Sequence, residues 1–174
     1  MEKTNSTGKV IKNILSYVLI IIVAILIKMF VFSPIKVNGT SMSPTLEDGD
    51  IMILNEIGYY LNGVNRFDIV VIDYNGEKLI KRIIGLPGET IEYKNYDLYV
   101  NGEIVAENFK HKDTADFSIS ELDAEVIPDD YYFVVGDNRI NSKDSRMVGF
   151  IHKSKIMGKT NFVIYPFDSI GTVQ

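Results

Sequence analysis

The chain has 174 residues and a net charge of −5, contains no cysteine, and is 46% hydrophobic. This length suits one ordinary domain with an appendage. The lack of cysteine excludes disulfides, thiol catalysis and cysteine metal sites, and the negative charge gives no reason to expect nucleic-acid binding.

The first element is an apolar segment at residues 14–32, ILSYVLIIIVAILIKMFVF, in which Lys28 is the only charged residue. At about 1.5 Å per residue, a helix of this length spans the roughly 30 Å hydrocarbon core of a bilayer. The alternative is a removable signal peptide, but its best cleavage point, after Ser33, is followed by Pro34, which is a poor residue for a cleaved bond. We therefore predict one uncleaved N-terminal transmembrane helix.

The lysines around this segment favour a cytoplasmic N-terminus by a small margin. Three lysines precede the segment, and two lie at or beyond its far end. The positive-inside rule assigns the side with more basic residues to the cytoplasm. The expected organisation is a cytoplasmic tail at residues 1–13, the anchor at 14–32, and an extracytoplasmic domain at 33–174.

Downstream of the anchor, short β-like runs alternate with turn dipeptides, which predicts an all-β domain. The dipeptides Asn75-Gly76 and Asn101-Gly102 favour tight hairpins. The predicted strands lie at residues 50–54, 67–73, 79–84, 97–100, 131–135 and 161–165. Residues 107–125 are polar and acidic, so we expect a surface insertion there, with at most a short helix near residues 118–124.

The stretch NGTSMSPTL at residues 38–46 holds two candidate nucleophiles, Ser41 and Ser43. A serine nucleophile needs a base that takes its proton. The two histidines, His111 and His152, lie in polar stretches beside no obvious carboxylate partner. A Ser-His-Asp triad is therefore not supported.

A lysine is a second kind of base. Within LIKRII at residues 79–84, Lys81 and Arg82 lie on opposite faces of a predicted strand. One of these two side chains must point into the layer that the sheet packs against, unless the strand lies at an edge where both charges reach water. A lysine acts as a base only when it is neutral, and lowering its pKa from about 10.4 to about 8 costs roughly 3 kcal/mol, which burial can impose. The pattern alone does not pair Ser41 with Lys81.

Three motifs, in order behind the N-terminal segment, resemble those of bacterial type I signal peptidases of the single-anchor kind found in Gram-positive bacteria. They are GTSMSPTL at 39–46, KLIKRIIGLPGE at 78–89, and GDNRINSKDSR with MVGFI at 136–151. The resemblance covers nearly everything from the anchor to the C-terminus. It implies a signal-peptidase-like β fold and a membrane-bound serine endopeptidase that removes signal peptides from exported preproteins after small residues of the Ala-x-Ala type.

The resemblance also implies roles for single residues. Ser41, directly before Met, is the expected nucleophile, Lys81 is the expected general base, and Ser43 occupies a variable position. Ser142 matches a serine that hydrogen-bonds and orients the lysine. Asp144 and Arg146 match an ion pair that supports the site, and Asp137 belongs to the same support. The apolar residues expected to form shallow substrate pockets are Ile35, Val37, Met42 and Leu79.

The chain departs from the family pattern at two positions. Ile140 stands where many members carry Asp, in a place we judge peripheral to catalysis. Gly39 stands where Gram-negative enzymes carry a serine that donates to the oxyanion. The backbone N–H of Ser41 can still donate, and the sequence identifies no second donor.

The resemblance implies no cofactor, metal or nucleic acid, and a monomer that acts on secreted preproteins at the outer side of the lipid bilayer. The stretch at residues 136–146 also lacks the glycine and glutamate of an EF-hand calcium loop. Two alternatives remain open: a specialised peptidase for pilin assembly or for one substrate, and a non-catalytic assembly factor of the same family. The presence of both Ser41 and Lys81 argues against the second alternative.

Overall fold

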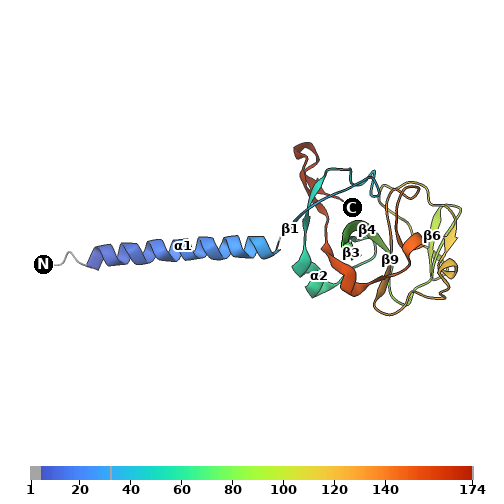
Figure 1. Cartoon of the computed structure of the whole chain (residues 1–174), viewed down its shortest axis with the longest axis horizontal. Helices are drawn as coiled ribbons and strands as arrows, with labels where there is room; N and C mark the ends of the chain where they lie inside the picture. Colours follow the sequence, from blue (N-terminus) through green and yellow to red (C-terminus); the bar gives the residue numbers. More distant parts are fainter. Residues whose placement is uncertain (1–4, 32, 174) are drawn as a thin grey trace. The chain divides into compact units, whose positions relative to one another are not determined.

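The structure is a computed structural model that describes residues 5–31 and 33–173. It divides into two compact units, Met1–Ser33 and Pro34–Gln174. Helix α1 (Asn5–Val31) makes up nearly all of the described part of the first unit (Figure 1). Its described side chains, at residues 8–24, are all exposed. No helix in the described part of the chain combines the length and the apolar character needed to cross a membrane. The anchor predicted at residues 14–32 extends beyond this description, which omits residue 32 and the side chains of residues 25–31.

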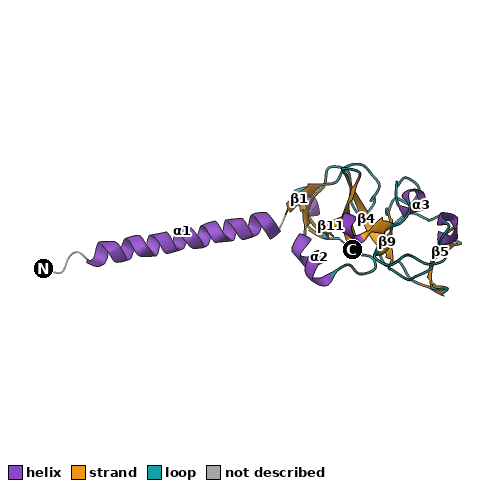
Figure 2. Ribbon diagram, turned by 60° about the horizontal axis from the view of Figure 1, so that its bottom comes forward, coloured by secondary structure: helices purple, strands orange, loops and turns teal. Residues whose placement is uncertain are grey.

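The described part of the second unit is built mainly from three β-sheets (Figure 2). The first sheet has the order β1 (Ser33–Lys36), β2 (Ile51–Leu54), β12 (Phe162–Tyr165) and β13 (Gly171–Thr172). The second is antiparallel and has the order β10 (Ile151–His152), β9 (Tyr131–Val135), β4 (Glu77–Gly85), β3 (Ile69–Tyr74) and β11 (Ile156–Lys159). The third has the order β7 (Glu103–Ile104), β6 (Asp97–Val100), β5 (Ile91–Lys94) and β8 (Phe117–Ser118).

Short helices connect these strands. Two are α-helices, α2 (Glu56–Asn62) and α3 (Ser145–Val148), and three are 3₁₀ helices, η1 (Ile119–Leu122), η2 (Lys153–Lys155) and η3 (Phe167–Ser169). Helix α2 was not predicted from the sequence, because it buries none of its seven residues and so shows no apolar periodicity. Its start is fixed locally, because the side chain of Asn55 accepts a hydrogen bond from Gly58 N over 2.7 Å.

The six predicted strands and both predicted hairpins are confirmed. The strands correspond to β2, β3, β4, β6, β9 and β12. The hairpin between β3 and β4 has positive φ angles at Asn75 (54°) and Gly76 (85°), and the hairpin between β6 and β7 has them at Asn101 (52°) and Gly102 (81°). Asn-Gly turns of this kind match the twist of the flanking strands, which explains why the dipeptides identify them.

The segment at residues 107–125, expected to be a surface insertion, is partly exposed but also packs in part into the fold. Phe117 pairs with Tyr93 in the third sheet, and both side chains belong to a buried cluster together with Ile119. Thr114 is 0% exposed. These buried residues are separated by polar ones and form no periodic pattern, so composition alone suggested a surface loop. The short helix expected near residues 118–124 is present as η1.

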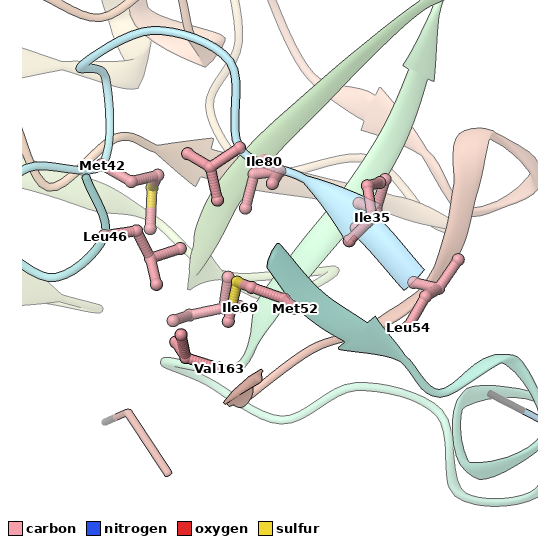
Figure 3. Close-up of a cluster of buried hydrophobic side chains, with 10 residues drawn as sticks. Ile35, Met42, Leu46, Met52, Leu54, Ile69, Ile80 and Val163 are labelled. Atoms are coloured by element: carbon pink, nitrogen blue, oxygen red, sulfur yellow. The ribbon is translucent and has the colours of Figure 1, made fainter. Parts of the chain in front are cut away.

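Strand β4 is central in the five-stranded sheet, with β3 and β9 beside it (Figure 1). A hydrophobic core joins this sheet to the first sheet and to the loop at residues 38–46 (Figure 3). Its members include Ile69 and Ile80 from the central sheet and Met42 and Leu46 from the loop. The core therefore ties the loop that carries Ser41 to the strand that carries Lys81.

Candidate active site

The loop between β1 and β2 holds Ser41 in a tight turn. Ser43 N donates to Thr40 O over 3.1 Å, and Leu46 N donates to Met42 O over 3.0 Å. The side chains of Met42 and Leu46 are fully buried in the core, while Ser41 is half-buried. The apolar anchors fix the turn, while Ser41 itself stays partly exposed.

Lys81 contacts Ser41 directly. Its Nζ donates to Ser41 Oγ over 2.7 Å and to the carbonyl oxygen of Ile80 over 2.9 Å. Both Lys81 and the neighbouring Arg82 are buried, at 2% and 1% exposed, so the alternative in which both charges reach water at an edge strand is wrong. Arg82 lies where β4 pairs with both β3 and β9, and the side chain of Lys81 reaches the turn that carries Ser41.

Burial gives Lys81 an unusual proton affinity. Desolvation of its ammonium, opposed by the carboxylates of Asp144, Glu77 and Asp137, lowers the pKa of Lys81 from 10.5 to about 8. With such a pKa, about a tenth of the amine is neutral at pH 7 and about half at pH 8, against less than 0.1% for an ordinary lysine. The amine can therefore act as a base near neutral pH.

The other candidate groups for this chemistry lie elsewhere. Ser43 Oγ donates to Glu47 Oε1 over 2.9 Å. His111 Nδ1 lies 2.9 Å from Lys112 O, and His152 Nδ1 lies 2.8 Å from Ser154 Oγ. Within the described residues, neither histidine contacts Ser41, so the arrangement offers lysine, and not histidine, as the base.

The expected ion pair between Asp144 and Arg146 is present, with a separation of 2.8 Å. Asp144 also caps helix α3 by accepting from Arg146 N, and it accepts from Gly136 N over 3.1 Å. Burial alone would raise the pKa of Asp144, but the charge and hydrogen bonds of Arg146, together with Ser142 and the Gly136 backbone, outweigh burial, and the pKa is lowered. Asp144 therefore stays ionised beside its cation.

Asp137 has a partner that was not predicted from the sequence. It forms a two-point ion pair with Arg82, whose Nε and Nη2 donate to it over 2.9 and 2.6 Å. Both side chains are almost fully buried, and a buried guanidinium requires such a counter-charge. Arg82 follows Lys81 in the second motif, and a central strand with a buried arginine could have indicated that a carboxylate lay nearby.

The expected hydrogen bond between Ser142 and Lys81 is not formed. Ser142 Oγ is buried and makes no hydrogen bond of ordinary geometry within the described part of the chain, while its proximity helps to lower the pKa of Asp144. Lys81 Nζ instead bonds Ser41 and the carbonyl of Ile80. The orienting acceptor for the amine in this structure is thus a backbone carbonyl of its own strand.

A cleft of about 280 Å³ opens beside the Ser41–Lys81 pair. The residues that line it are Val37, Asn38, Ser41, Met42, Gly76, Glu77, Lys78, Leu79, Ile80 and Lys81. Three of the four expected pocket residues, Val37, Met42 and Leu79, are among them. Ile35 is not among them; its side chain lies in the core with Leu54 and Met52 (Figure 3).

One edge of β4 is open along this cleft. In the described sheet, residues 77–81 pair with β3, whereas pairing with β9 begins at Arg82. An unpaired strand edge offers backbone donors and acceptors to an extended peptide. Among the described residues, no group of His, Asp or Glu side chains is placed to hold a metal ion.

Comparisons with known proteins agree on one family. Residues 10–165 match the family described as signal peptidase, peptidase S26. Signal peptidase I of Bacillus amyloliquefaciens is 39% identical over 176 residues, covering 97% of this chain and 95% of the relative. Signal peptidase IB of Staphylococcus aureus (strain COL) is 39% identical over 175 residues, covering 90% of this chain and 92% of the relative.

A solved structure is similar as well. The crystal structure of a signal peptidase I from Enterococcus faecalis V583 matches with a TM-score of 0.51 and 37% identity, covering 55% of this chain and 95% of that one. The family match spans well over half of the chain, and the curated relatives match along nearly all of it. The chain therefore belongs to the signal peptidase family, peptidase S26.

Proposed function

We propose that Ser41 and Lys81 are the nucleophile and the general base of this enzyme, which is a serine peptidase that cleaves signal peptides from secreted preproteins. The observation that carries the assignment is the 2.7 Å contact between Lys81 Nζ and Ser41 Oγ, together with the lowered pKa of Lys81. A buried lysine that is partly neutral can take a proton from a serine, which is an established variant of the nucleophile–base pair.

The first chemical step forms an acyl-enzyme. Ser41 Oγ attacks the scissile carbonyl carbon while its proton moves to the neutral Lys81 Nζ, and the carbonyl electrons move onto oxygen. The N–H of Ser41 donates to no acceptor among the described residues, so it is free to donate to this oxyanion. The intermediate then collapses, the C–N bond breaks, and the Lys81 ammonium gives its proton to the leaving amine.

The second step hydrolyses the ester. Lys81 is neutral again after protonating the amine, and it takes a proton from an incoming water molecule as the water attacks the acyl carbon. Collapse of this second intermediate returns a proton to Ser41 Oγ and releases the new carboxylate of the signal peptide. The buried carbonyl of Ile80, 2.9 Å from Nζ, holds the amine in place throughout both steps.

The cleft supports a preference for small residues before the cut. The apolar walls at Val37, Met42 and Ile80 lie next to Ser41, and the cleft holds only about 280 Å³. A preprotein segment bound as an extended strand along the open edge at residues 77–81 would alternate its side chains between these walls and solvent. Short side chains of the Ala-x-Ala type suit such a shallow site.

The proposed organisation is a single-pass membrane protein that acts as a monomer, with residues 1–13 cytoplasmic, 14–32 in the bilayer and 33–174 outside. One observation and the proposed role support it. Apolar side chains such as Leu15 and Leu19, both 62% exposed, lie on the surface of α1, where water would not stabilise them. The proposed role places the β domain on the outer side, because a preprotein loses its signal peptide after it has crossed the membrane.

Cleavage of a preprotein tests the proposal. The purified full chain in detergent should cut a preprotein with an Ala-x-Ala site after the second small residue, and Ser41→Ala should abolish the cut. A panel of several preproteins separates the alternatives. A peptidase dedicated to one substrate or to pilin assembly would leave most of the panel intact, and a non-catalytic assembly factor would cut none.

A further inference from the structure

The peptide group between Thr40 and Ser41 is held from its carbonyl side by Asn138. Asn138 Nδ2 donates to Thr40 O over 3.0 Å, and Asn138 N donates to Ser41 O over 3.0 Å. We propose that Asn138 is a positioning residue that aims the N–H of Ser41 at the oxyanion of the reaction intermediate. This inference rests on the proposed function and names a residue of the site that neither the resemblance nor the motifs had assigned a role.

The direction of the Ser41 N–H follows from peptide geometry. A trans peptide is planar, and its C=O and N–H groups point in opposite directions. The carbonyl of Thr40 belongs to the same peptide as the N–H of Ser41, so fixing one fixes the other. Thr40 O accepts both from Asn138 Nδ2 and from Ser43 N, at 3.0 and 3.1 Å. The plane is thus held by two donors, on the side opposite to the N–H.

Asn138 acts from a rigid, buried position. It is 5% exposed, and its buried Oδ1 has no hydrogen-bond partner among the residues that the structure describes. The hydrogen bonding of this side chain therefore runs through its donor atom alone. The backbone just before Asn138 is also tightly packed, because a Cβ added at Gly136 would overlap both Ser41 O and Ser142 Oγ. Little space remains in which the nucleophile's backbone could shift.

The next residue, Arg139, anchors the same loop to other parts of the domain. Arg139 is buried and donates to Tyr93 Oη over 3.1 Å and to Glu107 Oε2 over 3.2 Å. Asn138 is thus fixed relative to the third sheet and to the packed segment at 107–125. A donor held in advance costs no reorganisation when charge develops on the substrate oxygen, and a hydrogen bond to Thr40 O also polarises the peptide so that its N–H becomes a stronger donor.

The test compares Asn138→Ala with wild type on a preprotein substrate. We expect kcat to fall about 10- to 100-fold with KM within about twofold, since the oxyanion forms only after substrate binding. The pH midpoint of the rate should not move, because the surroundings of Lys81 are unchanged. Asn138→Asp keeps the shape of the side chain but loses the donor when ionised, and it should lose activity to a similar extent. Titration of active sites normalises each rate to folded enzyme.

A second measurement reports on the oxyanion itself. In a boronic acid analogue of an Ala-x-Ala peptide, boron accepts an electron pair from Ser41 Oγ as the serine proton moves to Lys81, and an oxygen on boron occupies the oxyanion position. Its affinity should fall in Asn138→Ala by about the same factor as kcat. The matched control is Asn141→Ala, which removes an exposed 3.3 Å bond to Thr40 Oγ1 on the same loop and should change kcat less than about threefold.

Several outcomes would overturn the inference. They are an unchanged kcat in Asn138→Ala, an unchanged boronate affinity alongside a reduced kcat, or an equal loss in Asn141→Ala. If wild type does not cleave the substrate, or if Ser41→Ala cleaves it as well as wild type does, the proposed function itself fails. If wild type cleaves and Asn138→Ala matches it, only the positioning role is wrong.

Discussion

Asp144 accepts two hydrogen bonds from the guanidinium of Arg146, at 2.9 and 2.8 Å. Asp144 is also the carboxylate that most opposes the lowering of the Lys81 pKa by burial. The two facts are linked, because the positive charge of Arg146 offsets the negative charge that Lys81 would otherwise experience. Arg146 thereby helps to keep the amine of Lys81 partly neutral.

Removing the charge of Arg146 should therefore shift the activity to higher pH. In Arg146→Gln the pKa of Lys81 rises, so a higher pH is needed to produce the neutral amine, and the midpoint of kcat/KM against pH should move up by roughly half a unit to one unit. Lys143→Gln is the control, since it removes a cation of the same loop that lies over the ring of Tyr74. A midpoint that stays in place, or moves to lower pH, in Arg146→Gln would contradict the linkage.

The two serines of the turn should differ sharply. Ser41→Ala should lower cleavage below detection and leave thermal stability nearly unchanged, because Ser41 is half-buried and, among the described residues, its hydroxyl bonds only Lys81. Ser43→Ala should keep most activity, since Ser43 Oγ bonds Glu47 at the outside of the turn. Both variants are measured by the rate of preprotein cleavage and by the unfolding midpoint. Equal losses of activity in the two variants would refute the assignment of the nucleophile.

The packed segment at residues 107–125 should be needed for stability. Glu107 pairs with the buried Arg139, so Glu107→Ala leaves a buried guanidinium without its counter-ion and should lower the free energy of unfolding by about 3 kcal/mol. Asp113→Ala, an exposed position in the same segment, should change it by less than about 0.5 kcal/mol. Urea denaturation of the two variants measures the difference. Similar stabilities would mean that the Arg139 network contributes little.

The proposed topology predicts where the β domain can be reached. Protease added outside intact protoplasts should degrade residues 33–174 and leave a short membrane-bound fragment. A cytoplasmic marker protein serves as the control and should survive until the protoplasts are lysed. Protection of the β domain up to the point of lysis would contradict the proposed orientation.

The sequence predicted those parts of the fold that have local signals. β-branched runs identified the strands that flank the core, and Asn-Gly dipeptides identified two hairpins. Strands of two residues, such as β8 and β10, and helix α2 lack such signals, because their pairing or packing partners lie far away in the chain. The burial of Thr114 was missed for the same reason.

The candidate site likewise depends mostly on long-range contacts that leave no local signal in the sequence. No periodicity relates Ser41 to Lys81, which meet only because the core packs their loop and strand together. Their pairing could be expected only through the resemblance of three motifs to a known family. The ion pair of Arg82 with Asp137 and the bonds from Asn138 to the nucleophile's backbone are long-range contacts that no local pattern indicates. The orientation of Ser142 depended on side-chain packing and was not anticipated.

The pH dependence of a single turnover tests the central claim, that Lys81 is the base for Ser41. With enzyme in excess over a preprotein, the cleavage rate should rise about tenfold per pH unit below pH 8 and level off above it, following the pKa of Lys81 near 8. Lys81→Arg should be inactive at every pH, because a guanidinium keeps its proton. A rate that is flat from pH 6 to 9 with chemistry limiting, or substantial activity in Lys81→Arg, would show that another group takes the serine proton.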